Sequence, residues 1–169
     1  QYQKCTPDVV VMDLSMPGIG GLEAIRKIKN YDKKAKILVF SVHESDIFLE
    51  RTLEEGVLGY ITKRSAAKVM VEAVRQVALD KAFIGQEMQP LLAKERKDGN
   101  NPVFAGLSAR EFEVFLLLAQ GKAVVEIAET LHLSPKTIGH HYTNVKNKLN
   151  ASNTAELTRL AIREGLLQP

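Results

Sequence analysis

Closely spaced helix start and stop signals in the last third of the chain constrain its fold most. Ser108 followed three residues later by Glu111 is a capping box, which predicts that a helix begins there. Gly121 is expected to end this helix in a left-handed cap. Ser134 is the expected N-cap of a later helix, with Pro135 in the first helical position, where a missing N–H does no harm. A shorter helix between them is predicted by an apolar stripe: Val125, Ile127, Ala128 and Leu131.

The helix expected over residues 135–149 has two different faces. Four residues at helical spacing are expected to pack inward: Ile138, Tyr142, Val145 and Leu149. Six polar or small residues are expected to face outward: Lys136, Gly139, His140, Thr143, Asn144 and Asn147. No Asp or Glu occurs from His132 to Ala155. Attraction to phosphates supplies much of the affinity for DNA, so this face favours DNA binding over the alternative of an ordinary surface helix that lacks acids.

A last helix is expected to begin near Asn153, where Glu156 completes another capping box, and to end at Gly165. Its apolar stripe of Leu157, Leu160 and Ala161 is suited to closing a small core.

Residues 107–167 resemble the LuxR-type helix-turn-helix family. The matching residues are Leu107, Ser108, Arg110, Glu111, Gly121, Glu126, Ile127, Ala128, Leu131, Ser134, Lys136, Thr137, His141, Lys148, Leu149 and Glu156. The resemblance implies four helices, of which the third lies in the major groove, and a homodimer on DNA paired through the last helix.

The resemblance also implies a role for individual residues. Gly139, His140 and Thr143 stand where family members contact base edges. The positions that hold phosphates in the family are Ser134, Lys136, Thr137, Lys146 and Asn147. Gly139 departs from the family, which often has a long basic side chain there, so we expect base readout to depend on His140, Thr143 and DNA shape. Val124 and Val125 replace a usual polar pair.

The first half of the chain alternates between apolar runs and helical patterns. Three short apolar runs cover residues 8–12, 37–40 and 59–62, and each leads to a polar residue: Asp13, Ser41 and Lys63. Runs of this kind are typical of strands buried on both faces of a parallel sheet. The intervening segments have helical spacing, so an α/β layer structure with right-handed crossovers is predicted.

In such a sheet the carboxyl ends of adjacent strands converge, so Asp13, Ser41 and Lys63 are expected to meet. A carboxylate can accept a phosphoryl group, a hydroxyl can bond its oxygens and an ammonium can neutralise its charge. For any one of them taken singly, an unrelated polar residue at the end of a strand is the plainer interpretation.

As a set, these residues resemble the receiver domain of two-component response regulators. The phosphoacceptor loop is matched by Asp13, Leu14, Ser15, Met16 and Pro17, with Gly21 after them. The resemblance makes Asp13 the phosphoacceptor, Ser41 and Lys63 its phosphoryl-site support, and Tyr60 the switch aromatic. A receiver followed by a LuxR-type domain is the architecture of the NarL/FixJ family of bacterial regulators.

The resemblance implies Mg²⁺ in a complete receiver, held by Asp13 together with a pair of acids at the end of the family's first strand. This chain has no such strand, so it is either a fragment of a longer regulator or a truncated receiver. We favour the fragment, which lacks the first strands of the family's 2-1-3-4-5 order. The strand before Asp13 would then be a bare apolar edge. As written, the chain is expected to bind DNA without taking up Mg²⁺ or a phosphoryl group.

The expected fold is therefore α/β, a partial flavodoxin-like receiver followed by an all-α four-helix LuxR-type helix-turn-helix domain. We expect the receiver in residues 1–85, a short helix and linker in residues 86–103, and the DNA-binding domain in residues 104–169. The linker expectation comes from the charged, breaker-rich run at residues 94–102.

The composition agrees with a cytoplasmic protein, and both family resemblances imply a bacterial one. The formal net charge is only +3, so the signal for DNA is local to one helix. The single cysteine, Cys5, excludes an internal disulfide and suits a reducing compartment. No segment is expected to span a membrane.

The sequence thus predicts a transcription regulator and no enzyme, with double-stranded DNA and a sensor histidine kinase as partners and RNA polymerase as a candidate. One alternative is a phosphatase that uses Asp13 as nucleophile, but Ser15 stands where such enzymes carry a second acid. The other is a sigma-factor-like subunit, for which the strand-rich first half gives no support.

Overall fold

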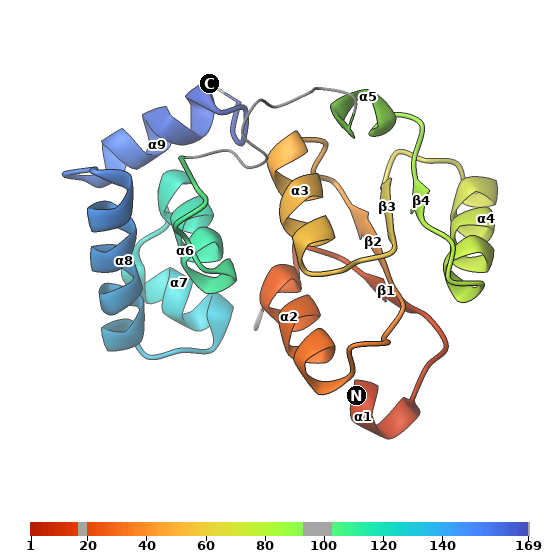
Figure 1. Cartoon of the computed structure of the whole chain (residues 1–169). Coiled ribbons are helices and arrows are strands. Elements are labelled where there is room, and N and C mark those ends of the chain that lie inside the picture. The colour runs from red at the N-terminus through yellow and green to blue at the C-terminus, as the bar shows by residue number, and fades with distance from the viewer. Residues whose placement is uncertain (17–19, 93–102, 169) are drawn as a thin grey trace. The chain divides into compact units, whose positions relative to one another are not determined.

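The computed structural model of the chain describes residues 1–16, 20–92 and 103–168. The chain divides into two compact units, one N-terminal and one C-terminal (Figure 1). The linker expected at residues 94–102, and Pro17 of the expected phosphoacceptor loop, lie outside the described residues. No helix in the described ranges is long and apolar enough to cross a bilayer.

The N-terminal unit is built on a parallel sheet with the strand order β1-β2-β3-β4. Its strands are β1 (Val10–Met12), β2 (Ile37–Ser41), β3 (Gly59–Thr62) and β4 (Phe83–Ile84). The three strands expected from the apolar runs are confirmed. The fourth was not expected, because two residues are too few to show a periodic pattern. It pairs with β3 through Gly59 opposite Phe83 and Tyr60 opposite Ile84.

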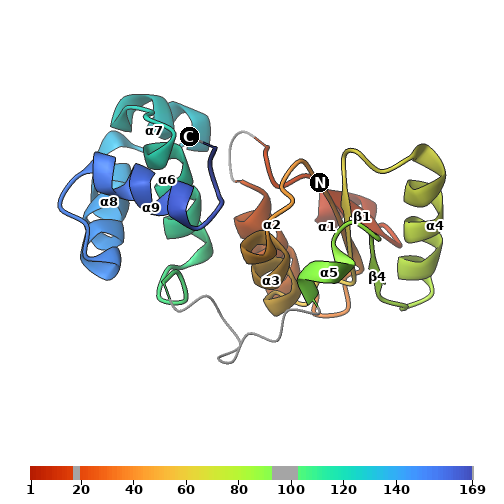
Figure 2. The same ribbon diagram turned by 90° about the horizontal axis from the view of Figure 1, so that it is seen from above.

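Helices cover both faces of this sheet, as the α/β prediction requires. Helices α2 (Gly21–Tyr31) and α3 (Asp46–Glu54) lie on one face and α4 (Ala67–Ala78) on the other (Figures 1 and 2). The α4 face has a fully buried core of Leu38, Ile61, Ala73 and Val77. Two four-residue helices complete the unit: α1 (Tyr2–Cys5) and α5 (Gln89–Leu92). The latter lies within residues 86–103, where a short helix and a linker were expected.

The expectation that the strands are buried on both faces is confirmed for the inner strands β2 and β3 and is wrong for β1. All four residues of β3 are buried, whereas Val11 in β1 is 46% exposed. The reason is position: among the described residues β1 pairs only with β2, so it lies at an edge of the sheet. This agrees with the expected bare apolar edge.

The C-terminal unit contains the four expected helices. They are α6 (Ala109–Ala119), α7 (Val124–Leu131), α8 (Pro135–Leu149) and α9 (Thr154–Arg163). The capping box of Ser108 and Glu111 is present, and Gly121 follows α6 with a φ of 83°, in the left-handed region where glycine is favoured. Rings of Phe104, Phe112 and Phe115 pack together with centroids 5.1 to 6.0 Å apart.

One residue of the α7 stripe was assigned wrongly. Ile127, Ala128 and Leu131 are buried as expected, but Val125 is 57% exposed. Val125 lies in the first turn of α7, and its spacing to Ile127 is two residues, which does not place both side chains on one helical face.

Candidate functional site

The carboxyl ends of β1 and β3 bring Asp13 and Lys63 into direct contact. Lys63 Nζ donates to Asp13 Oδ2 at 2.6 Å, and the N–H of Ser15 donates to Asp13 Oδ1 at 2.9 Å. Burial alone would raise the pKa of Asp13, but the bonds from Lys63 and Ser15 outweigh it and hold the pKa below its ordinary value. Asp13 is therefore an ionised carboxylate at neutral pH, and it is partly accessible to solvent.

The backbone after Asp13 is packed closely by the start of α2, at a position that only glycine can fill. A Cβ on Gly21 would lie 2.4 Å from Leu14 Cα and 2.5 Å from the Asp13 carbonyl oxygen. The N–H of Gly21 also donates to the Leu14 carbonyl at 3.3 Å. Gly21 therefore allows the helix to approach the loop that carries the carboxylate.

Ser41 and Tyr60 are both fully buried beside this edge of the sheet. The Ser41 carbonyl accepts from the N–H of Lys63 at 2.8 Å, while Ser41 Oγ accepts from the N–H of His43 at 3.1 Å. The Tyr60 hydroxyl donates to the His43 carbonyl at 2.8 Å, and burial raises the pKa of that hydroxyl. The structure thus joins Ser41 to Lys63 through the backbone and joins Tyr60 to the loop that follows β2.

His43 belongs to this site although the sequence analysis did not assign it a role. Its Nε2 lies 3.1 Å from Ser15 Oγ, and its ring stacks on Phe48 with centroids 3.8 Å apart. Burial lowers the pKa of His43, against the opposite effect of Asp13. A signal was available: Ser15 and His43 each lie two residues after a strand-end residue of the site, so their loops leave the same edge of the sheet.

The donor set at this edge does not meet the needs of Mg²⁺. The ion prefers six oxygen ligands in near-octahedral geometry. Within residues 1–16, 20–92 and 103–168 no group of three or more His, Cys, Asp or Glu side chains could hold a metal. Asp13 alone does not meet this requirement.

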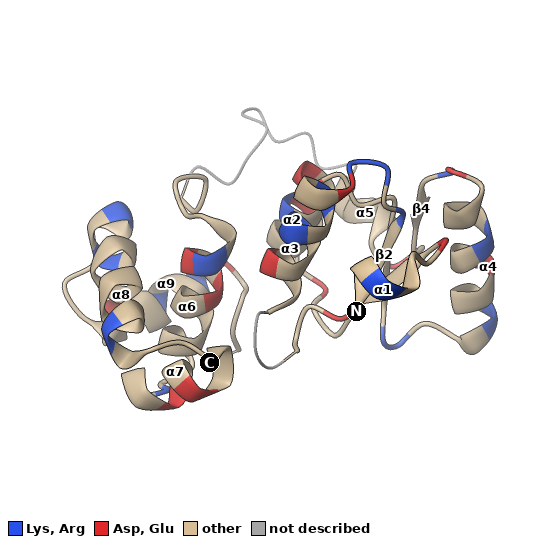
Figure 3. Cartoon of the chain, turned by 90° about the horizontal axis from the view of Figure 1, so that it is seen from below, with Lys and Arg blue, Asp and Glu red and all other residues tan. Residues whose placement is uncertain are grey.

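The exposed side of α8 carries the polar residues that the sequence placed there. Five residues of the expected outward face are exposed: Lys136, His140, Thr143, Asn144 and Asn147. Ile138 and Val145 are fully buried on the opposite side, and Tyr142 and Leu149 are half-buried, so the division into two faces is confirmed. Figure 3 shows Lys positions along α8, and the helix itself contains no Asp or Glu.

The first turn of α8 is closed by hydroxyl groups. Ser134 caps the helix, its Oγ accepting from the N–H of Thr137 at 3.1 Å and lying 2.8 Å from Thr137 Oγ1. Gly139 is half-buried, but a Cβ built on it would have no atom within 4 Å apart from the nearby backbone of its own helix and its two chain neighbours. The position is therefore open to an approaching partner.

Two further side chains of α8 are held by the domain itself. Thr143 Oγ1 donates to the Gly139 carbonyl at 3.0 Å, so its hydroxyl proton is used within the helix. Lys146 Nζ lies 4.8 Å from the centroid of the Tyr142 ring, a cation–π contact that restrains the ammonium beside the helix. The hydroxyl oxygen of Tyr142 in turn lies 2.9 Å from Thr154 Oγ1, within hydrogen-bonding distance.

The last helix begins as expected but with a different partner for its acid. Asn153 caps α9 by accepting from the N–H of Glu156 at 3.0 Å. The Glu156 carboxylate accepts from the N–H of Ser152 at 2.7 Å. In a regular capping box it would accept from the N–H of the N-cap residue, Asn153. Leu157 and Ala161 are fully buried and Gly165 has a φ of 70°, so the helix closes the small core and ends where expected.

Both units match known families. Residues 1–75 match the family described as response regulator receiver domain, and residues 105–161 match the bacterial regulatory proteins of the luxR family. The response regulator UvrY of Escherichia coli K12 is 40% identical over 161 residues, which cover 94% of this chain and 74% of UvrY. The transcriptional activator protein ExaE of Pseudomonas putida is 39% identical over 171 residues, covering 99% of this chain and 80% of ExaE.

A solved structure matches both units of this chain. RcsB of Salmonella enterica serovar Typhimurium, bound to promoter rprA in the presence of the phosphomimetic BeF3⁻, is 27% identical and has a TM-score of 0.61. The match covers 94% of this chain and 76% of RcsB. The chain belongs to the NarL/FixJ family of response regulators, in which a receiver domain of a two-component system precedes a LuxR-type DNA-binding domain.

Proposed function

We propose that this response regulator binds double-stranded DNA by placing α8 in the major groove, and that phosphorylation of Asp13, in a receiver that also carries the family's pair of first-strand acids, controls it. The observation that carries the DNA-binding part is the exposed, acid-free face of α8. Acids there would repel phosphates, whereas Lys136 and Lys146 attract them. In this proposal the receiver covers residues 1–85 and the DNA-binding domain residues 104–169, with residues 86–103 between them.

The face of α8 supports separate roles for its residues. Gly139, His140 and Thr143 contact base edges, with Asn144 beside them. The phosphate contacts are Ser134, Lys136, Thr137, Lys146 and Asn147. Phosphate contacts set the register of the helix on the duplex, while contacts to base edges carry sequence preference.

The pairing of Asp13 with Lys63 supports phosphoryl transfer. An Asp13 carboxylate oxygen attacks the phosphorus of a phosphohistidine on a sensor histidine kinase, the P–N bond breaks, and the departing imidazole nitrogen keeps the electron pair. Lys63 then neutralises the added charge on the phosphoryl oxygens. Asp13 is a stoichiometric acceptor in this reaction, so the protein is a regulator and no enzyme.

The remaining partners follow from the same function. A homodimer on DNA would read two half-sites about one helical turn apart. The promoter-bound state of RcsB supports a promoter as the target of this chain too, and RNA polymerase is then a candidate partner. A protein with these partners acts in the bacterial cytoplasm.

A salt series of DNA binding tests the role of α8. Lys136→Ala and Lys146→Ala should weaken binding to random and selected DNA alike, and each should make the log–log salt slope shallower by about one unit. Lys27→Ala, an exposed lysine of α2, is the matched control and should leave the slope unchanged. Unchanged slopes for both α8 variants would remove this face from the interface.

Intact-protein mass spectrometry with acetyl phosphate and Mg²⁺ tests the role of Asp13. We expect no phosphoryl-sized gain for residues 1–169 alone. A version extended at its N-terminus by the family's first strands and acid pair should gain one, and Asp13→Asn should abolish it. A gain that survives Asp13→Asn would assign the phosphoryl group to another residue.

A further inference from the structure

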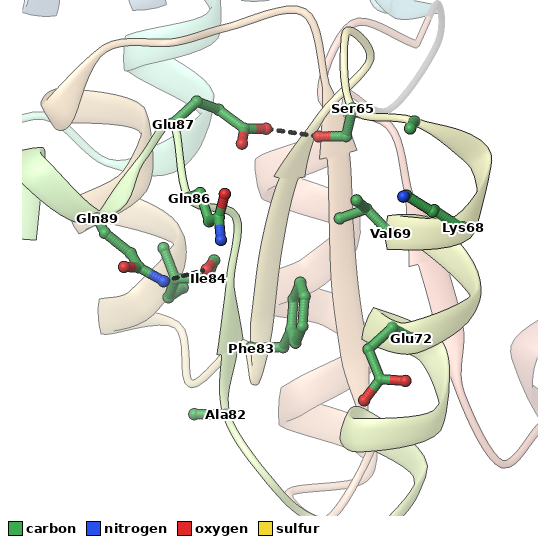
Figure 4. A pocket seen from close by; sticks show the side chains of 11 residues that line it. Ser65, Lys68, Val69, Glu72, Ala82, Phe83, Ile84, Gln86, Glu87 and Gln89 are labelled. Carbon is green, nitrogen blue, oxygen red and sulfur yellow. Dashed lines mark hydrogen bonds between the residues drawn. The ribbon is translucent and has the colours of Figure 1, made fainter.

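The carboxylate of Glu87 binds the loop that carries Lys63. Glu87 lies between β4 and α5, and its Oε1 accepts from Ser65 Oγ at 2.5 Å (Figure 4). The same oxygen accepts from Thr62 Oγ1 at 2.9 Å. The N–H of Thr62 points to the same oxygen at 3.4 Å. One carboxylate oxygen therefore holds residues on both sides of Lys63 in the chain.

The loop is held from its other side by the sheet. The N–H of Lys63 donates to the Ser41 carbonyl at 2.8 Å, and the N–H of Ser65 donates to the Thr62 carbonyl at 3.1 Å. Thr62 is fully buried at the end of β3. The backbone of Lys63 is thus restrained between Ser41 and the residues that Glu87 binds, while its ammonium reaches Asp13.

The segment that carries Glu87 is itself anchored. Its Gly85 N–H donates to the Tyr60 carbonyl at 2.8 Å, and Met88 is fully buried. A Cβ on Gly85 would lie 2.9 Å from Glu87 Oε1, so the glycine lets the carboxylate fold back towards the loop. The backbone on either side of Glu87 is therefore anchored, and the carboxylate binds Thr62 and Ser65 from a restrained segment.

Glu87 is ionised in this arrangement. Burial would raise the pKa of its carboxyl, but the bonds from Ser65 and Thr62 outweigh that effect and lower it. Hydrogen bonds to an ionised acceptor are roughly twice as strong as neutral ones. The contact is consequently stronger than a pair of ordinary surface hydrogen bonds.

We propose that Glu87 is a positioning residue for Lys63, and that it couples the β4–α5 segment to the phosphoryl site. The proposal rests on the role given above to Asp13 and Lys63. Coupling between two sites is reciprocal, so a displacement of the Lys63 loop by a phosphoryl group on Asp13 would also weaken the hold on β4–α5. That segment leads in sequence towards the DNA-binding domain.

Amide hydrogen exchange of residues 1–169 tests the proposal without any phosphoryl donor. In Glu87→Ala the Lys63 N–H should exchange about tenfold faster relative to the amides of β2, the effect of losing a charged hydrogen-bond acceptor. Glu87→Gln, which keeps an acceptor oxygen, should recover part of the protection. Ser65→Ala removes one bond from the opposite partner and should speed the same amide.

The matched control is Glu72→Ala, which removes an exposed glutamate that lines a surface pocket together with Ser65 and Glu87 and accepts a hydrogen bond from Gln76 on its own helix. It should leave Lys63 unchanged. The proposal is overturned if Glu87→Ala alters the Lys63 amide no more than this control. It is also overturned if all amides of the unit speed up equally in Glu87→Ala, because Glu87 would then act on stability alone.

A second measurement separates this proposal from the proposed function. In the extended version that accepts a phosphoryl group, Glu87→Ala should slow the gain in mass and Glu87→Gln should restore part of the rate. Equal rates for Glu87→Ala and the wild type would overturn the positioning role. Failure of the extended wild type to gain any mass would instead contradict the role of Asp13, and the exchange result would still decide whether Glu87 positions Lys63.

Discussion

Lys148 Nζ lies 2.6 Å from Glu111 Oε2, so the last turn of α8 is tied to the first turn of α6. The Glu111 side chain is only 5% exposed and the same oxygen accepts from the N–H of Ser108 at 2.8 Å. One carboxylate thus closes the capping box of α6 and holds the helix proposed to enter the DNA groove. Lys148 is therefore engaged within its own domain, unlike Lys136.

We expect Lys148→Ala to destabilise the C-terminal unit by about 1–2 kcal/mol, because it leaves a buried carboxylate without its cation. This loss of stability is smaller than for a fully buried ion pair, because Lys148 is half-exposed and solvent screens its charge. Urea unfolding followed by circular dichroism measures it, with Lys136→Ala as the control that should change little. Equal stability of the two variants would mean that solvent replaces the ion pair without loss.

The same pair predicts a dependence of stability on pH. Burial would raise the pKa of the Glu111 carboxyl, but the bonds from Lys148 and Ser108 hold it below its ordinary value. A carboxyl with a depressed folded-state pKa stabilises fully above its unfolded-state pKa, and this contribution is lost as the pH falls through the folded-state pKa. Glu111→Gln should therefore flatten the acid side of the curve of melting temperature against pH. An unchanged acid slope in that variant would assign the dependence to other carboxylates.

Gly139→Ala should stabilise α8. Glycine in a helix interior costs roughly 1 kcal/mol against alanine, and the structure has room for the added methyl group. The melting temperature should rise, while affinity for DNA should fall if the groove approaches the bare backbone there. A variant that is more stable and binds DNA as tightly as the wild type would show that close approach at Gly139 is not needed.

Thr143 offers a test of how α8 reads bases. Because its hydroxyl donates to the Gly139 carbonyl, we expect its methyl group to make the base contact, as threonine does with the methyl of thymine. Thr143→Val should then preserve sequence preference, whereas Thr143→Ala should relax it at one base pair by about 1 kcal/mol, the value of one lost methyl contact. Competition binding against single-base variants of a selected site gives both values. Relaxed preference in Thr143→Val would show that the hydroxyl carries the contact.

Local signals in the sequence determined the C-terminal unit almost completely. Ser108, Ser134 and Gly121 act within a few residues of themselves, through caps and left-handed turns, and the helices begin and end where these residues predict. The two faces of α8 also follow from a short-range period. Val125 was misplaced because it was grouped with Ile127, which lies two residues away and so projects from a different face of the helix.

In the N-terminal unit, the apolar runs predicted β1, β2 and β3 and indicated that Asp13 and Lys63 would share an edge. The contacts made there by Ser15, His43 and Glu87 depended on the tertiary structure, since each joins a residue to another at least 22 positions away in the chain. Polar contacts across such separations leave no period or local cap in the sequence. They arise only when the strand order and the crossover connections place the loops side by side. For the same reason, neither the two-residue β4 nor the role of Glu87 after it could be predicted from the sequence.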